Sequence, residues 1–428
     1  MVSGWLIVLA AALCLALGAP LFTALGVVTL ACVYFLGDGL LVEVIADMFN
    51  TVNKDMLLAI PFFVAAGQIM TEGTIAKRLV RAAQALFGWL PAGLAVTAVM
   101  ACIFFAAISG SSAVTLIAVG SVLYPALRRS GYPEKFSLGL LTTGGSLGVL
   151  VPPSIPMILY AVVVSTPQAP VAVGDLYLAG IVPALLIAAA LAGYSMWVQR
   201  KQARERFSLA EVGASLKGGF WSLLLPFIVL GSIYTGMCTA TEAAAISVVY
   251  AAVVEIFIHR EMSFRKIPGV LVQGSLTMGT LFLVIVLSMS LNQYLALEQI
   301  PQKLAEDIQG VISSKWAFAI LVNIFLLIAG CPMDMMSAIL LLGPILSPMA
   351  QAYGFDPVHF AVIFIVNMEI GYLTPPIGLN LFIASSVFKS PMERVVTACI
   401  PFMVIMTVCL GVITWFPGIS LWLVHALK

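Results

Sequence analysis

The chain interrupts its apolar sequence with small and hydroxyl-bearing residues that could bind a cation. One interruption reads SGSS (109–112), and another, GGSLGVLVPPS (144–154), contains a pair of prolines. Glycine and proline break helices, and a broken helix leaves backbone carbonyl oxygens without partners. Such carbonyls and serine hydroxyls form the all-oxygen set that suits a hard ion such as sodium. We therefore expect a sodium site with ligands from Ser109, Gly110, Ser111, Ser112, Gly145, Gly148 and Val151.

A second pair of interruptions, AGCPMD (329–334) and GYLTPP (371–376), offers a similar set. It adds a carboxylate, Asp334, deep in apolar sequence, where a charge is costly and usually functional. Aspartate is also a good N-cap for the helix that would follow, and the two roles are compatible. We expect a second sodium site, with candidate ligands Gly330, Cys331, Met333, Asp334, Gly371 and Thr374.

Each break is followed by a helix that restarts, and these helix N-termini would point at the same centre. Their positive dipole ends and free N–H groups favour an anion. Proline at the start of a helix costs little, because its missing N–H would be unpaired there anyway. The pattern implies a carboxylate substrate, with candidate contacts Ser111, Pro153, Ser154, Asp334, Pro376 and Asn380.

Several of these residues also have less specific interpretations. A single cluster such as 109–112 is common where membrane helices pack closely, whereas two matched breaks, each followed by Pro-Pro, favour a site. Glu369 could be a ligand, a proton-coupled group or an internal counter-ion, and these alternatives stay open. Glu242 has the capping-box spacing from Thr239, so we interpret it as structural.

The composition identifies a polytopic membrane protein. Of 428 residues, 62% are hydrophobic and 9% are charged, and the mean hydropathy is +1.11, so the chain has more apolar side chains than a soluble core could bury. The net charge of +1 offers no basic surface for nucleic acid. Seven scattered cysteines predict free thiols. No Ser/His/Asp set or HExxH motif supports an intramembrane enzyme.

Some apolar runs, which we call plain, are uninterrupted, and others, which we call punctuated, contain breaks made of small residues or proline. A helix that crosses the membrane takes about 20 residues. The plain runs predict spans at 4–17, 20–36, 55–71, 178–198, 219–237, 241–258, 270–295 and 395–425. The punctuated regions predict two re-entrant helical hairpins, at 88–129 and 315–352, and two broken helices, at 134–166 and 357–388. The fold class is therefore all-α.

These elements divide the chain into a scaffold and a transport domain. Two amphipathic stretches, 41–54 and 259–269, predict arm helices at the membrane interface. The scaffold, with its arms, comprises 1–54, 174–270 and the C-terminal helix 395–428. The transport domain comprises 55–173 and 271–394, each part holding one hairpin and one broken helix.

Basic residues predict the orientation, because Lys and Arg accumulate on the cytoplasmic side. Sixteen of the 20 fall in five clusters, at 77–81, 128–135, 200–217, 260–266 and 389–394. If all five lie on one side, the first hairpin must enter and leave the membrane there. The first thirty residues contain no Lys or Arg, which argues against a cleaved signal peptide and for a retained first span that begins in the periplasm.

The two halves of the chain repeat each other. The VPPSI and TPPIG boxes are 223 residues apart, and SGSSAVTL (109–116) falls on the segment that begins AGCPMDMM (329–336). An odd number of crossings between them makes the second half inverted. Inverted repeats with broken helices in matching positions are typical of secondary transporters, which bind substrate at the repeat interface.

With ISGSS, GGSLGVLVPPS, GCPMDM and TPPIGLNLF in this order, the chain resembles the large membrane subunit of tripartite ATP-independent periplasmic (TRAP) transporters, the DctM-like family. The resemblance covers essentially the full length. AIPFFVAAGQIM (59–70) and TATEAAAISVVYA (239–251) are also similar to family boxes, although the family usually has proline where Ala240 stands here.

The resemblance implies a sodium-coupled importer of an organic acid, such as a sialic acid or a C4-dicarboxylate, in the bacterial inner membrane. It implies an elevator motion, two or more sodium ions, and two partners: a small four-helix membrane subunit, expected as a separate chain, and a periplasmic substrate-binding protein. The alternative is a stand-alone sodium- or proton-coupled carboxylate carrier without a binding protein, with Glu369 as the group that would carry the proton.

Overall fold

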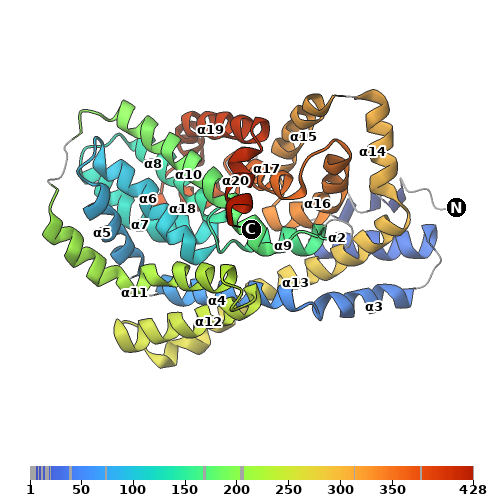
Figure 1. Cartoon of the computed structure of the whole chain (residues 1–428), viewed down its shortest axis with the longest axis horizontal. Helices are drawn as coiled ribbons and strands as arrows, with labels where there is room; N and C mark the ends of the chain where they lie inside the picture. Colours follow the sequence, from blue (N-terminus) through green and yellow to red (C-terminus); the bar gives the residue numbers. More distant parts are fainter. Residues whose placement is uncertain are drawn as a thin grey trace.

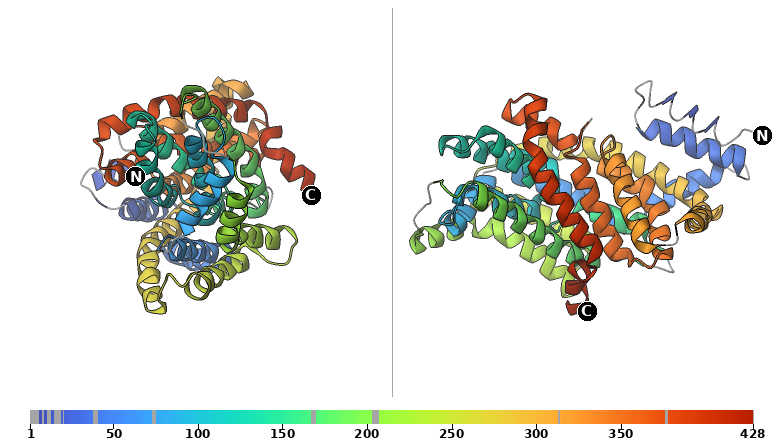
Figure 2. Two further views of the ribbon diagram at one scale, coloured as in Figure 1. Left: turned by 90° about the vertical axis from the view of Figure 1, so that its left-hand side faces the viewer. Right: turned by 90° about the horizontal axis from the view of Figure 1, so that it is seen from above.

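The computed structural model describes residues 6–7, 9–10, 13–14, 19, 21–37, 41–72, 75–166, 170–202, 207–312, 314–375 and 378–427. Within these ranges the regular elements are helices, and no strand occurs. The molecule is elongated, with α2 and α3 near one end of its long axis and α5 to α8 near the other (Figures 1 and 2). The all-α fold class predicted from the sequence is confirmed.

The first half of the chain forms helices that lead into a hairpin and a broken helix. They are α2 (Leu21–Ala31), π-helix η1 (Cys32–Leu36), α3 (Leu41–Val52), α4 (Asp55–Glu72), α5 (Ile75–Phe87), α6 (Gly93–Ser109), α7 (Ser112–Arg129), α8 (Glu134–Ser146), 3₁₀-helix η2 (Leu147–Val149), α9 (Ile155–Val164) and α10 (Val173–Val198). The helices α6 and α7 form the first hairpin, and α8 and α9 are the two parts of the first broken helix.

The second half repeats this order. It comprises α11 (Leu209–Tyr234), α12 (Ala240–Val253), π-helix η3 (Val254–Ile258), 3₁₀-helix η4 (Phe264–Lys266), α13 (Ile267–Leu297), α14 (Ile300–Val311), α15 (Lys315–Gly330), α16 (Met335–Ala352), α17 (Pro357–Gly371), α18 (Leu379–Phe388), α19 (Met392–Trp415) and α20 (Gly418–Leu427). The second hairpin is α15 with α16, and the second broken helix is α17 with α18. Both predicted hairpins and both predicted breaks are confirmed.

Helices of one half pack against helices of the other half in matching pairs. The hairpin helix α7 of the first half packs against α18 of the second, and α16 of the second half packs against α9 of the first. In the same way α4 packs against α12, and α13 packs against α2. Each half therefore supplies the neighbours that the other half lacks, as expected for two repeats related by an approximate two-fold axis.

Two sequence predictions about helix boundaries were wrong. Residues 259–269 do not form a separate arm helix, because the 3₁₀ turn η4 runs directly into α13, where Pro268 is tolerated in the first turn. The predicted C-terminal helix 395–428 is two helices, with a break at Phe416 and Pro417. Proline disfavours the helical conformation in the residue before it, and Phe416 has φ −116° and ψ 86°.

Seven helices in the described part of the chain are long and apolar enough to cross a membrane, or eight if the bent pair α14 and α15 counts as one span. The seven are 55–72, 173–198, 209–234, 240–258, 264–297, 335–352 and 392–415. The hairpin helix α6 and both parts of each broken helix have 10 to 17 residues. This length and composition fit a multi-pass membrane protein.

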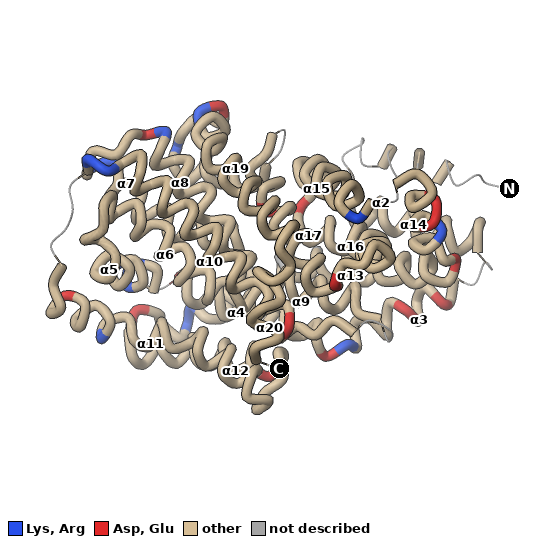
Figure 3. Tube along the Cα trace, turned by 45° about the horizontal axis from the view of Figure 1, so that its top comes forward, with Lys and Arg blue, Asp and Glu red and all other residues tan. Residues whose placement is uncertain are grey.

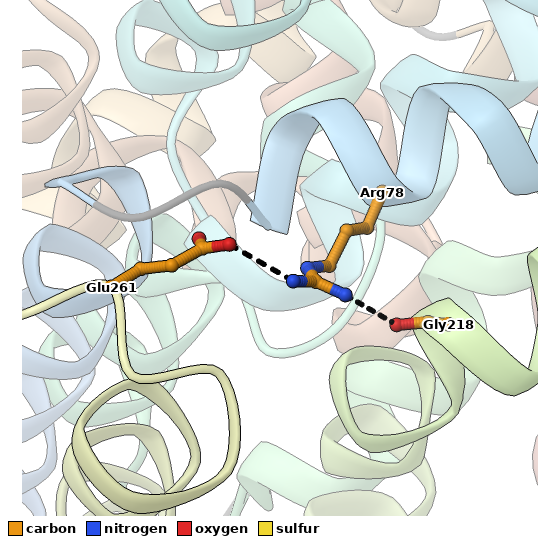
Figure 4. A network of polar contacts seen from close by, with 3 residues as sticks. All are labelled: Arg78, Gly218 and Glu261. Carbon is orange, nitrogen blue, oxygen red and sulfur yellow. Dashed lines mark hydrogen bonds and ion pairs between the residues drawn. The ribbon is translucent and has the colours of Figure 1, made fainter.

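Polar contacts connect the five basic clusters, in one case through Gly218, which directly follows the cluster 200–217. The guanidinium of Arg78 donates to the carboxylate of Glu261, at 2.9 Å, and to the carbonyl oxygen of Gly218, at 3.1 Å (Figure 4). Gln202 donates to the Gly131 carbonyl, and Arg394 lies 3.9 Å from Glu134. Lys and Arg lie at helix ends and connections and also within helices, as in α5 and α11 (Figure 3). These contacts fit the predicted placement of the five clusters on one side; the periplasmic start of the chain stays a prediction.

Removing the Arg78–Glu261 ion pair is expected to cost little stability. The two side chains are 31% and 27% exposed, and pairs of this kind contribute about 0.2–1 kcal/mol. A double-mutant cycle with Arg78→Gln and Glu261→Gln, measured by unfolding in mild detergent, should give a coupling free energy in that range that decreases with added salt. A coupling insensitive to salt would contradict this.

Candidate functional site

A cavity of about 510 Å³ lies where the two hairpin tips meet. Its polar side consists of residues at the tips and breaks, including Ser109, Ser111, Ser112, Asp334, Ser337 and Tyr372. A second part of the lining, which we call the wall, comes from α2, α4 and α13 and is apolar except for Gln68; its members include Phe22, Val64, Met278, Leu281 and Val284. The cavity therefore has one side suited to a polar ligand and one side that offers it almost no hydrogen bonds.

Three oxygen atoms gather at the tip of the first hairpin. Ser109 Oγ lies 2.9 Å from Thr115 Oγ1, and Thr115 Oγ1 donates to the Ser111 carbonyl oxygen at 2.8 Å. Ser109 Oγ lies 3.3 Å from the same carbonyl oxygen. Ser109 and Thr115 are both buried. The turn between the two helices is made by Gly110, whose φ of +59° is in the left-handed region that favours glycine.

Glycines bring the first break into backbone contact with this tip. A Cβ atom at Gly148 would lie 2.7 Å from the Ser111 carbonyl oxygen, and one at Gly145 would lie 2.8 Å from the Leu116 side chain. A Cβ at Gly110 would lie 2.3 Å from the carbonyl oxygen of Pro153. Three of the predicted ligand glycines therefore have a clear steric role, since no larger residue fits this approach.

Two other predicted residues of the first break lie differently. Val151 is partly buried, and its N–H donates to the Leu147 carbonyl oxygen at 3.4 Å. Ser154 is fully buried and caps α9, with its Oγ accepting from the N–H of Met157 at 3.3 Å. Neither lines the cavity, although Ile155 and Pro156 at the start of α9 do.

The tip of the second hairpin is built in a similar way. A Cβ at Gly371 would lie 2.7 Å from the Gly330 backbone, so the hairpin and the break touch through glycine again. The Cys331 carbonyl oxygen accepts from the N–H of Gly378 at 3.4 Å, and Thr374 Oγ1 donates to the Ile370 carbonyl. Met333 is partly buried against the core. The predicted contact Pro376 lies outside the described residues.

Asp334 caps α16, as one of its two interpretations predicts. Its Oδ1 accepts from the N–H groups of Met336, at 2.8 Å, and Ser337, at 3.3 Å, and its Oδ2 accepts from the Ser337 hydroxyl. The hydroxyl oxygen of Tyr372 accepts from the N–H of Met335 at 2.7 Å. The carboxylate is exposed to the cavity, so capping leaves it accessible to a cation.

A hydrogen bond joins the two halves at the centre of the site. Asn380 Nδ2 donates to Ser112 Oγ at 2.6 Å, and both side chains are buried. Asn380, a predicted substrate contact, thus belongs to the same cluster as the first tip, 268 residues earlier in the sequence.

Four polar residues of the cavity or the tips were missed by the sequence analysis: Gln68, Thr115, Ser337 and Tyr372. Tyr372 lies inside the GYLTPP box and Thr115 lies one helical turn after Ser111, so position beside a break was an available signal. Ser337 is at the capping distance from Asp334. Gln68 is brought to the cavity only by the packing of α4, and nothing in its local sequence marks it.

The charge of the cavity is unusual for an anion site. Among its described lining residues Asp334 is the only charged one, and no Lys or Arg is present. The first residues of four helices, α7, α9, α16 and α18, line it instead. Helix N-termini favour anions. The described residues contain no group of three or more His, Cys, Asp or Glu that could hold a metal ion, so a cation here would depend on backbone and hydroxyl oxygens.

The two glutamates have different environments. Glu242 forms the predicted capping box, with its carboxylate accepting from the N–H of Thr239 at 2.8 Å. Glu369 is fully buried, and neither of its carboxylate oxygens has a hydrogen-bond partner in the described part of the chain. It does not line the cavity.

Known proteins are similar to this chain in sequence or in fold. The family model described as "Tripartite ATP-independent periplasmic transporter, DctM component" matches residues 7–419. The C4-dicarboxylate TRAP transporter large permease protein DctM of Pseudomonas aeruginosa is 44% identical over 378 residues, 87% of each protein. The isethionate TRAP transporter permease protein DctMQ of Oleidesulfovibrio alaskensis is 36% identical over 96% of this chain and 64% of its own length.

A solved structure has the same arrangement of helices. The YdaH transporter of Alcanivorax borkumensis aligns with a TM-score of 0.66 over 92% of this chain and 90% of that chain, at 13% sequence identity. At this identity the likeness shows the fold alone.

Proposed function

Because the chain belongs to the DctM component family of tripartite ATP-independent periplasmic transporters, we propose that it imports an organic acid across the bacterial inner membrane together with sodium ions. Family membership makes it a TRAP transporter large permease, a multi-pass membrane protein and not an enzyme. The observation that carries the proposal is that both hairpin tips and the N-termini of four helices line one cavity.

The proposed substrate is a small organic anion that binds with its charged end at the tips. Relatives are named for C4-dicarboxylates and for isethionate, which share a small size and an acidic group. The cavity has no basic side chain among its described residues, so the substrate charge would be balanced by helix N-termini and by co-bound sodium. This balance gives a physical reason for coupling, because the anion binds weakly until the cation is present.

The first sodium ion is assigned to Ser109 Oγ, Thr115 Oγ1 and the Ser111 carbonyl oxygen. These atoms already lie 2.8 to 3.3 Å from one another. We propose that carbonyls of the break complete the shell: those of Gly145 and Gly148, whose backbone lies against this tip, and that of Val151. The second ion is assigned to the other tip, with Gly330, Cys331, Met333, Asp334, Gly371 and Thr374 as the proposed donors.

The proposed motion is an elevator, in which the hairpins and broken helices carry the ligand past a fixed wall. The wall formed by α2, α4 and α13 is apolar apart from Gln68, so it would hold the substrate weakly. Because α4 packs against α12 and α13 packs against α2, we now assign α4 and α13 to the fixed side. Our sequence-based boundaries had included both helices in the transport domain.

The proposed partners are a small membrane subunit and a periplasmic substrate-binding protein, as for TRAP transporters in general. We propose that the small subunit is a separate chain. The isethionate relative is longer than this chain, which spans 64% of it.

Uptake by proteoliposomes tests the proposed function. Vesicles that contain this chain with its small subunit should accumulate one of a panel of radiolabelled organic acids, sialic acids and C4-dicarboxylates included, only with an inward sodium gradient and the periplasmic binding protein. Uptake that ignores sodium would contradict the coupling. Uptake without the binding protein would favour the stand-alone carrier. If a proton gradient drove that uptake and Glu369→Gln abolished it, Glu369 would be the coupling group.

A further inference from the structure

Asn380 is bonded to groups on two sides and yet lies outside the cavity. It is fully buried in the first turn of α18 and is not among the described residues that line the cavity. Its backbone N–H donates to the Tyr372 carbonyl oxygen at 3.2 Å, and its side-chain Nδ2 donates to Ser112 Oγ at 2.6 Å. A residue placed in this way holds other groups in position and does not itself reach a ligand in the cavity.

These two bonds belong to a longer path that joins the two hairpin tips. The hydroxyl oxygen of Tyr372 accepts from the N–H of Met335 at 2.7 Å, while its carbonyl oxygen accepts from the N–H of Asn380. The path therefore begins at the first residue of α16, passes through the second break and Asn380, and ends at Ser112, the first residue of α7. All four residues are buried, so water competes little for these hydrogen bonds.

The two ends of the path are equivalent positions of the repeat. Ser112 and Met335 are 223 residues apart, which is also the spacing of the two Pro-Pro boxes. Each directly follows a proposed sodium ligand. The Ser111 carbonyl shares one planar peptide unit with the N–H of Ser112, and the N–H of Met335 shares one with the Asp334 carbonyl. Holding Ser112 and Met335 therefore restricts how the proposed ligand before each of them is oriented.

The first break does not repeat this path. The residues 223 positions before Tyr372 and Asn380 are Val149 and Met157, whose side chains have neither a hydroxyl nor an amide group. The N–H of Met157 donates locally instead, to Ser154 Oγ at 3.3 Å. The link made by Tyr372 and Asn380 is thus not duplicated at the equivalent positions, and a single substitution can interrupt it.

We propose that Asn380 is a positioning residue that couples the two tips, so that sodium bound at one tip raises the affinity of the other tip for sodium. An ion at the second tip orders the break around Tyr372, and the path transmits this order to Ser112 and the Ser111 carbonyl. The reverse effect is equal by thermodynamic linkage, and such coupling typically changes an affinity about 5–150-fold. The inference rests on the proposed function in assigning sodium to the tips.

Binding of radioactive sodium to the purified chain with its small subunit tests the coupling without transport. The wild type should bind with a Hill coefficient clearly above about 1. Asn380→Leu replaces the amide with an apolar group of similar size. It should bind with a Hill coefficient of about 1 and a half-saturating sodium concentration at least about fivefold higher. A merely structural role would reduce the amount of sodium bound without changing the Hill coefficient.

Asn367→Leu is the matched control. Asn367 is also fully buried, its Nδ2 donates to Asn323 Oδ1 at 2.7 Å, and its Oδ1, like that of Asn380, has no hydrogen-bond partner in the described structure. It does not line the cavity and is not part of the path. Its variant should keep the wild-type Hill coefficient. Equal losses in the two variants, wild-type cooperativity in Asn380→Leu, or a wild type that binds sodium without cooperativity would overturn the proposal.

Two further variants interrupt the same path at other points. Tyr372→Phe removes only the oxygen that accepts from Met335, and Ser112→Ala removes the oxygen that accepts from Asn380. Each should lower the Hill coefficient as Asn380→Leu does. Adding Ser112→Ala to Asn380→Leu should cause no further loss, because both remove one bond; additive losses would contradict the path. If Asn380→Leu does not fold, Tyr372→Phe decides.

Hydrogen exchange measures the coupling in the absence of any ligand. Asp334→Ala removes the cap of α16 and should loosen the second tip. Amides 112–115 of the first tip should then exchange about fivefold faster or more. In the Asn380→Leu background, Asp334→Ala should cause no further increase at these amides. The same increase in both backgrounds would overturn the coupling, whether or not sodium binds.

The transport assay separates this inference from the proposed function. If no acid of the panel is taken up while Asn380→Leu abolishes cooperative sodium binding, the proposed function fails and the coupling stands. If sodium drives uptake and Asn380→Leu keeps the wild-type Hill coefficient, the proposed function stands and this inference fails.

Discussion

Thr115→Val is expected to raise the sodium concentration for half-maximal uptake about tenfold or more, while the protein still inserts and folds. The substitution keeps the shape of the side chain and removes the oxygen that lies 2.9 Å from Ser109 Oγ and 2.8 Å from the Ser111 carbonyl oxygen. A polar contact to a charged group is worth about 1.5–3 kcal/mol, and each 1.4 kcal/mol changes an affinity about tenfold. The measurement is initial uptake rate against external sodium in proteoliposomes.

Thr97→Val is the matched control for this prediction. Thr97 is a buried threonine on α6 of the same hairpin, its hydroxyl has no partner in the described structure, and it does not line the cavity. Its replacement should leave sodium activation unchanged. A sodium dependence of Thr115→Val equal to that of Thr97→Val would remove these oxygens from the proposed ion site.

Gly110→Ala is expected to have the largest effect on the folded site. The residue has φ +59°, which costs an alanine about 1–2 kcal/mol, and its Cβ would lie 2.3 Å from the Pro153 carbonyl oxygen. Overpacking against backbone costs about 1–3 kcal/mol more. The first tip and the first break must therefore separate, and we expect a clear decrease of Tm and loss of uptake by about a hundredfold.

Gly236→Ala isolates the backbone part of that effect. Gly236 has φ +71° and nothing within 4 Å of the added Cβ, so it carries the conformational penalty without the contact. Its Tm should fall by less than that of Gly110→Ala, and uptake should be near normal. Equal effects of the two substitutions on uptake would show that the contact with Pro153 is not needed.

Sequence reasoning was most successful where the signal was local. Both hairpins and both broken helices were predicted because glycine and proline interrupt long apolar runs at 109–112, 144–153, 329–334 and 371–376. The capping box of Glu242 was predicted for the same reason, since its partner is only three residues away. Backbone breaks and caps depend on neighbours in the chain, which a single sequence displays.

The rest of the site depends on which helices pack together. The bond between Ser112 and Asn380 spans 268 residues, and the place of Gln68 at the cavity follows from the packing of α4. The predicted second arm helix was wrong because its amphipathic pattern did not reveal that α13 begins there without a break. Steric roles of Gly145 and Gly148 were also not predictable, because the atoms they meet come from the neighbouring hairpin.

The reciprocal packing of the halves also affects how the protein is made. Since α7 packs against α18 and α16 against α9, a ribosome that has released only the first half has produced a hairpin without its neighbour. Ser112 acquires its bond to Asn380 only after residue 380 has been synthesised and inserted. Biogenesis therefore passes through a stage in which the first tip is held by its own half alone, and a nascent chain stalled before α18 should be recognised by membrane quality-control proteases.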